Sequence, residues 1–316
     1  MTKNKIFLLT TALEHAYKSD ESYLFLGEWC SLYSRRKAIK NISYQLLSYH
    51  WDDRKKAYAD FKYLEILNKQ LLQELTVILN NIHGKKYSEK TWNVLIGYWL
   101  TQFTAVVFDR WSMIDCAVKK YDNLETVILD IKSESCVPNN SSEAEQFFIN
   151  DRWNHYLYGI LIKKWSNIKT IQKQEAVHSK VIKKNKYHDT VLLRLKKQIK
   201  VTINWLLNLP PRSSIYIFGE VYLSFFDKIK LILSLKGAVN NRLFFDSEKI
   251  ELDVNFRKWN MVNDTYNNKF EEIVRSLLPE FMPKTFLEGF QGCNNENTIK
   301  SCNQKEKVIF TSGYHF

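Results

Sequence analysis

The chain has 316 residues and a formal net charge of +12, from 46 lysines and arginines against 34 aspartates and glutamates. With 45% hydrophobic residues and only nine glycines and five prolines, it has the composition of a globular protein, which excludes a disordered or fibrous chain. No run of about 18 apolar residues occurs, so no transmembrane helix is predicted.

Two short apolar runs begin the chain, at residues 5–13 and 23–29, and both have the length of buried strands. A polar segment separates them, so we predict two neighbouring strands of an α/β sheet, each ending in a loop. The apolar part of the first run is only about eight residues long and leads into Glu14 and His15, which is typical of a strand and not of a signal peptide.

Long helices are predicted next. Between residues 54 and 82 apolar side chains recur every three or four positions, which predicts one buried stripe with Asp52 or Asp53 as the N-cap. A second helix, with an aromatic stripe, is predicted from Ser88 to about residue 120, and the two should pack as an αα-hairpin. A strand at 126–131 and a third helix at 143–165 complete this half.

Most of the net positive charge lies in one tract, residues 163–200, which contains twelve lysines or arginines and only two acidic residues. Such a tract can contact nucleic acid, an anionic membrane leaflet or a polyanionic substrate. Apolar residues between the lysines also permit the simpler interpretation of a solvated helical face. Only Trp165 and Tyr187 could stack on bases, which argues against nucleic acid as a partner.

Beyond this tract we predict a strand at 215–218, helices at 222–235 and 264–278, and a polar loop at 288–305. The last nine residues read VIFTSGYHF, in which a short β-branched run leads into a Thr-Ser-Gly turn. Such a turn usually follows a strand as a ligand-binding loop. We therefore expect a first domain up to residue 300 and the start of a second domain in residues 301–316.

The densest polar segment is SYHWDDR at 48–54. It combines a titratable base, His50, with two carboxylates and a guanidinium at a predicted helix N-terminus, which suits acid/base or phosphate-binding chemistry. The other three charged members are Asp52, Asp53 and Arg54. A structural interpretation stays open, in which one aspartate caps the helix and the other pairs with Arg54.

Two further segments carry polar residues that could belong to a site. Glu28, in GEWC at 27–30, lies at the carboxyl end of the second predicted strand, and ligands of open α/β sheets bind outside the carboxyl ends of the strands. Cys30 beside it is interpreted as a packed residue and not as a nucleophile. Asp109 and Arg110 lie on the second long helix, where a charge pair that fixes helix packing would also explain them.

Several classes of site lack their motif. HExxH, Walker and GxGxxG sequences are absent, which argues against a metalloprotease, a P-loop NTPase and a simple dinucleotide enzyme. The five cysteines form no CxxC pair, which favours a reducing cytoplasm over a zinc ribbon or a disulfide framework. We therefore predict neither a metal nor a resident cofactor.

Five segments occur in a recognisable order and spacing: FLLTTALE at 7–14, YLFLGEWCSLYSRR at 23–36, YHWDDRKKAYADFKYLE at 49–65, LNNIH at 79–83 and WNVLIGYWLTQFTAVVFDRW at 92–111. Together they resemble the LIC-type transferases of bacterial O-antigen and surface-polysaccharide gene clusters. FFINDRWNHYLYGIL at 147–161 and the closing VIFTSGYHF also look like this family, whereas residues 163–300 resemble it only faintly.

The resemblance implies a GT-B-like glycosyltransferase that moves a sugar from a nucleotide-activated donor to O-antigen, lipopolysaccharide or capsule. The expected fold class is α/β, with a GT-B-like (Rossmann-like) N-terminal domain that carries long helical insertions and forms the acceptor side in residues 1–300. Residues 301–316 would be the linker and first strand and loop of a nucleotide-sugar-binding domain. Family members are usually longer, so this second domain is expected to be truncated, and the chain to be a partial or inactive enzyme if the remainder is required.

The same resemblance implies the partners. The nucleotide-activated sugar is a co-substrate, and the acceptor is a glycan or a lipid-linked glycan. A cytoplasmic location that allows peripheral contact with the inner membrane follows, together with a separate C-terminal half if the enzyme is split, and no nucleic acid.

Carried over residue by residue, the family's polar motifs give candidate roles. Glu28 or Asp52 would be the catalytic base, with His50 as the alternate. Substrate-binding residues would be Asp53, Arg54, Asp109, Arg110, Ser312, Gly313 and His315. The alternative function is a non-catalytic basic protein that docks on a membrane surface or nucleic acid through residues 163–200.

Overall fold

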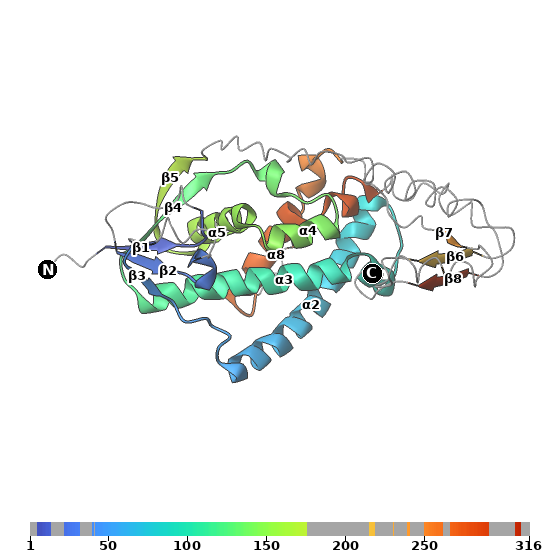
Figure 1. The fold of residues 1–316 in the computed structure, drawn as a ribbon. Helices are drawn as coiled ribbons and strands as arrows, with labels where there is room; N and C mark the ends of the chain where they lie inside the picture. The colour runs from blue at the N-terminus through green and yellow to red at the C-terminus, as the bar shows by residue number, and fades with distance from the viewer. Residues whose placement is uncertain are drawn as a thin grey trace. The chain divides into compact units, whose positions relative to one another are not determined.

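The computed structural model describes residues 5–13, 22–31, 40, 42–175, 215–218, 230, 239–240, 250–261, 266–290 and 307–310. The chain divides into two compact units (Figure 1). Unit 1 comprises Met1–Val177 and Lys249–Cys293, and unit 2 comprises His178–Glu248 and Asn294–Phe316. The predicted division at residue 300 stays a prediction. In the described segments, no helix is both long and apolar enough to cross a bilayer.

Unit 1 is built on a parallel sheet, so the predicted α/β class is confirmed. Its five strands pair in the order β3-β2-β1-β4-β5, which is compatible with a Rossmann-like fold. They are β1 (Ile6–Leu9), β2 (Tyr23–Phe25), β3 (Tyr44–Leu46), β4 (Leu124–Asp130) and β5 (Lys169–Gln174). The order reverses between β1 and β4, and in such sheets the crevice at the carboxyl ends of these strands is where ligands bind.

Two long helices, both predicted, lie between β3 and β4 in the chain. α2 (Arg54–His83) buries its leucine stripe, and α3 (Glu89–Lys120) begins at Ser88, whose hydroxyl accepts a hydrogen bond from the Thr91 backbone N–H. Gly84 ends α2 with a left-handed φ of 61°, which glycine adopts without steric cost. α2 packs against α3, which confirms the predicted αα-hairpin.

The predicted third helix at 143–165 is wrong in one respect, because the structure has two helices there. α4 (Ser141–Phe148) ends at Ile149, and α5 (Asp151–Trp165) starts again after Asn150. The Asn150 side chain accepts hydrogen bonds from the Arg152 and Trp153 backbone N–H groups, so it caps the new helix and breaks the old one. α5 packs on β4, and Figure 1 shows α3 running alongside α4, α5 and α8.

α8 (Lys269–Phe281) packs against α3. Its N-cap is Asn268, a few residues after the predicted start at 264. Its apolar face joins the single hydrophobic core of the unit, formed with the sheet and with α2, α3 and α5. Short 3-10 helices complete the unit: η2 (Glu28–Ser31), η4 (Ser133–Cys136), η5 (Val254–Arg257) and η6 (Lys284–Phe286).

Unit 2 contains a parallel sheet of three described strands in the order β7-β6-β8. They are β6 (Ile215–Phe218), β7 (Val239–Asn240) and β8 (Lys307–Phe310). The predicted strands at 215–218 and 308–310 are therefore confirmed. Except for Lys230, the predicted helix at 222–235 lies outside the described residues, as do most of the basic tract, Ser312, Gly313 and His315.

Candidate active site

The loops that follow β1, β2 and β3 meet at the carboxyl edge of the unit 1 sheet, because the three strands are parallel neighbours. Trp29, in η2 after β2, links them. Its indole N–H donates to the Thr10 carbonyl oxygen (2.9 Å) after β1, and its ring meets the Tyr49 ring edge-on after β3, with centroids 6.3 Å apart. The parallel pairing of β1 with β2 and of β2 with β3 therefore places the three polar loops side by side.

Asp109 on α3 is the centre of a hydrogen-bonded group that we name the Asp109 cluster: Tyr49, His50, Asp109, Arg110 and Asn154. The Tyr49 hydroxyl donates to Asp109 Oδ1 at 2.7 Å, His50 Nε2 lies 3.1 Å from the same oxygen, and Arg110 pairs with Oδ2. Burial acts to raise the pKa of the Asp109 carboxyl, but these bonds and the Arg110 charge outweigh it and hold the pKa below its ordinary value. The carboxylate is thus kept ionised in the interior.

His50 is buried between two charged groups, with its side chain fully shielded from solvent. Lys56 Nζ lies 3.2 Å from His50 Nδ1, and an ammonium can only donate, so Nδ1 accepts and the ring proton resides on Nε2, facing Asp109. Lys56 also pairs with Asp60, which accepts the Trp51 indole N–H at 2.9 Å. Both nitrogens of His50 are engaged, so the ring offers no free lone pair to a substrate in this arrangement.

Arg110 joins α3 to α5. Its Nε donates to Asn154 Oδ1 at 2.8 Å, and its guanidinium carbon lies 5.8 Å from the centroid of the Trp29 ring. About a fifth of the side chain is exposed. Arg110 therefore connects the Asp109 cluster to the loop after β2 and retains a small solvent-facing edge.

His155, next to Asn154 on α5, bridges β4 and the loop after β1, on either side of the point where the strand order reverses. The backbone N–H of Leu129 donates to its Nε2 at 3.1 Å, so Nδ1 carries the proton and faces Thr11 Oγ1 at 3.3 Å. Sequence reasoning missed Thr11, Asn154 and His155. The signal for Asn154 and His155 was a pair of adjacent polar residues between two aromatic ones, Trp153 and Tyr156, and no such signal marks Thr11.

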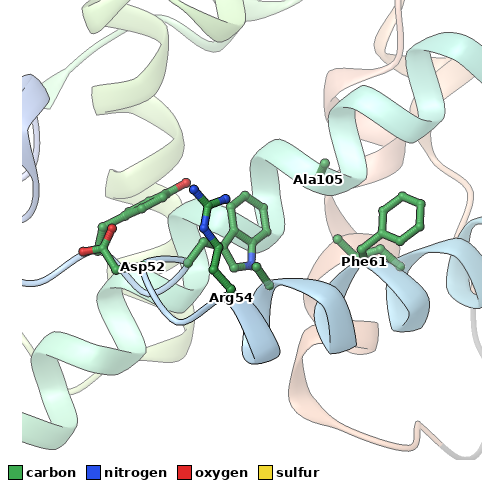
Figure 2. Close-up of a pocket in the computed structure, with 8 residues that line it drawn as sticks. Asp52, Arg54, Phe61 and Ala105 are labelled. Carbon is green, nitrogen blue, oxygen red and sulfur yellow. The ribbon is translucent and has the colours of Figure 1, made fainter.

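A pocket of about 550 Å³ opens beside the Asp109 cluster, at the N-terminal end of α2. Tyr49 is common to both, since it lines the pocket and donates to Asp109. Figure 2 shows Asp52 at one end of the pocket, Phe61 and Ala105 at the other, and Arg54 between them. Trp51, Leu64 and Ala57 complete the wall.

The predicted site residues fall into five groups. Asp52 and Arg54 are exposed and line the pocket, whereas His50, Asp109 and Arg110 lie in the cluster behind it. Asp53 caps α2, accepting from the Lys55 and Lys56 backbone N–H groups at 2.9 and 3.2 Å. Glu28 is exposed in η2 and does not belong to the described lining of the pocket. Ser312, Gly313 and His315 lie outside the described residues.

The cap contact predicts a clear effect of Asp53. Asp53→Ala should lower the free energy of unfolding by about 1 kcal/mol, because two N–H groups at the start of α2 lose their acceptor. The free energy of unfolding of Asp53→Asn should stay close to that of the wild type, since asparagine caps a helix equally well. Urea denaturation of both variants measures the difference. Equal losses in the two variants would contradict a capping role and point to the charge.

Cys30 is fully buried, and its thiol donates to the Leu9 carbonyl oxygen at 3.3 Å. Burial raises its pKa from 9.0 to about 12, so the reactive thiolate is disfavoured. This supports the interpretation of Cys30 as a packed residue. Among the described residues, no group of three or more His, Cys, Asp or Glu side chains is arranged to hold a metal ion.

The family comparison covers nearly the whole chain. The profile of a family described as "LIC12162 family transferase" matches residues 6–316, a span that includes all of unit 2 and all but the first five residues of unit 1. No curated protein and no solved structure matches the chain.

Proposed function

The chain belongs to the LIC12162 family of transferases, and on this premise we propose that it transfers a sugar from a nucleotide-activated donor to a surface-polysaccharide acceptor such as O-antigen or capsule. The observation that carries the proposal is the pocket beside the Asp109 cluster. It combines aromatic walls, one carboxylate and one guanidinium at the carboxyl edge of a parallel sheet.

The acceptor glycan would occupy this pocket. Tyr49, Trp51 and Phe61 supply rings on which the C–H faces of a sugar can pack, and the volume of about 550 Å³ lies within the usual range of about 300–1,000 Å³ for small-ligand sites. Unit 1 would thus be the acceptor side of a GT-B-like enzyme. Residues 301–316, with Ser312, Gly313 and His315, would belong to the donor side.

In the proposed reaction Asp52 is the general base. Its carboxylate takes the proton of an acceptor hydroxyl while that oxygen attacks the anomeric carbon of the donor. The bond from the anomeric carbon to the phosphate oxygen breaks, and the nucleotide leaves with the electron pair. Arg54 and the N-terminus of α2 would stabilise the charge that develops on the phosphate. Asp52 is preferred to Glu28 because only Asp52 lines the pocket.

The test measures nucleotide release from a panel of UDP-, GDP-, CDP- and CMP-activated sugars, with and without polysaccharide extracted from the host cell. One donor should be consumed only when acceptor is present. Asp52→Asn should lower kcat by about 100-fold or more, the usual worth of a general base, without changing thermal stability, because the side chain is exposed.

Asp53→Asn is the matched control, since it removes the neighbouring carboxylate charge and keeps the cap. Unchanged activity in Asp52→Asn would remove Asp52 from the mechanism. Failure of every nucleotide sugar, with another activated group being transferred instead, would overturn the proposed class of donor.

A further inference from the structure

A second pocket, of about 460 Å³, lies near the opposite edge of the unit 1 sheet. The last turns of α3 and α5 form much of its wall, and these helices end just before β4 and β5 begin. The pocket therefore lies toward the amino ends of these strands, whereas the candidate active site lies at the carboxyl ends. Its distinctive lining is Trp111, Lys164, Trp165, Asn167 and Lys269.

The two lysines of this pocket rest on tryptophan rings. Lys269 Nζ donates to the Trp165 carbonyl oxygen at 2.9 Å and lies 5.4 Å from the centroid of Trp111, and Lys164 Nζ lies 5.5 Å from that of Trp165. Within the described part of the chain, neither ammonium takes part in an ion pair. Cation–π contact holds them in place without neutralising their charge.

The nearby acids have other partners. Asp115, also in the lining, pairs with Lys119 at 2.6 Å, and Glu272 accepts the Trp165 indole N–H at 3.4 Å. The pocket thus presents two exposed ammonium groups beside two half-buried indoles, and the carboxylate in its lining, Asp115, is paired with Lys119. Asn167 adds an exposed side-chain amide that has no hydrogen-bond partner among the described residues.

We propose that this pocket is an accessory binding site for an anionic sugar, a pyranose ring that carries a carboxylate. The indoles would pack against the C–H face of the ring, the two ammonium groups would bind the carboxylate, and the Asn167 amide would bind a hydroxyl. A lone phosphate ion would use the lysines and leave the indoles unused. The site goes beyond the proposed transfer reaction, because binding here requires no catalysis and would hold when the transfer proposal fails.

The experiment is titration of the purified full chain with glucuronate, glucose, inorganic phosphate and UMP, followed by calorimetry and by saturation-transfer NMR. Glucuronate should bind at least about tenfold more tightly than glucose, because its carboxylate adds hydrogen bonds to a charged group. It should also bind at least about tenfold more tightly than phosphate, which has no ring to pack on the indoles. Its ring protons should receive saturation from the protein. Glucose or phosphate binding as tightly as glucuronate, UMP binding more tightly, or no glucuronate binding at all would each overturn the proposal.

Variants locate the site. Lys164→Gln and Lys269→Gln should each weaken glucuronate binding about tenfold and leave glucose binding unchanged. Lys62→Gln with Lys69→Gln, two exposed lysines on α2, is the control and should bind as the wild type does. Lys164 makes no hydrogen bond in the described part of the chain, so its variant stays informative even if Lys269→Gln lowers stability. Unchanged binding in both pocket variants would overturn the assignment.

Discussion

Replacing Asp109 with alanine is expected to lower the free energy of unfolding by about 3 kcal/mol. The side chain is 5% exposed and accepts bonds from Tyr49, His50 and Arg110, so its removal leaves a guanidinium and two further donors without their acceptor. Breaking a buried ion pair from one side costs about 3–5 kcal/mol, and the small exposed edge of Arg110 places the estimate at the lower end.

Urea denaturation at neutral pH measures the loss. Asp115→Ala is the matched control, because it removes an exposed carboxylate from the same helix and should change stability by less than about 0.5–1 kcal/mol. Similar values for the two variants would show that the Asp109 cluster does not stabilise the fold.

The same carboxylate makes a pH prediction with a definite sign. Its pKa is lowered in the folded state from the ordinary 3.8, so the unfolded chain binds the proton more readily. The contribution of Asp109 is therefore complete above about pH 4 and is lost as the pH falls through the lower folded pKa. Denaturation curves between neutral pH and pH ~2.5 should show a smaller acid-induced loss in Asp109→Ala than in the wild type.

Arg257→Ala should lower the free energy of unfolding at least as much as Asp109→Ala does, although Arg257 lies away from both pockets. The guanidinium forms a bidentate pair with Glu288, at 2.7 and 2.8 Å, and both side chains are less than 8% exposed. Its NH1 also donates to the carbonyl oxygens of Pro279 and Met282, at 2.9 Å each, where α8 ends. We expect a loss of about 3–5 kcal/mol, from a buried unpaired carboxylate and uncapped carbonyls.

A double-mutant cycle tests the cause. Arg257→Met with Glu288→Leu should cost less than Arg257→Met alone, because no unpaired charge stays buried. Lys62→Ala, which breaks an exposed pair with Glu65, serves as the control and should cost less than about 1 kcal/mol. If the double variant were less stable than the single one, the desolvation argument would be wrong.

The long helices were predicted closely from the sequence, because the features that start, stop and orient a helix depend on residues only a few positions apart. The N-caps at Asp53 and Ser88, the left-handed Gly84 and the apolar stripe of α2 are all set by neighbours in the chain. The break between α4 and α5 was missed, although it is also local, since Asn150 was read as part of one continuous apolar pattern.

Two strands of the sheet were missed for a different reason. All three residues of β3 are exposed, and four of the six residues of β5 are exposed, among them Lys169, Gln172 and Gln174, so neither strand has the apolar pattern of a buried strand. Both are edge strands, and their extended form depends on hydrogen bonds to β2 and β4. Exposed edge strands with charged side chains are common because they discourage pairing with other chains.

For the candidate site, local sequence patterns are enough to predict which residues carry charge and which lie at helix starts. They placed Asp52, Asp53 and Arg54 at the head of α2, which the structure confirms. The surroundings of the buried site residues depend on long-range packing, because Asp109 meets Tyr49 and His50 across about 60 residues and His155 meets Thr11 across 144. Burial and hydrogen-bond partners across such separations depend on how helices pack on the sheet, and no local pattern encodes that packing.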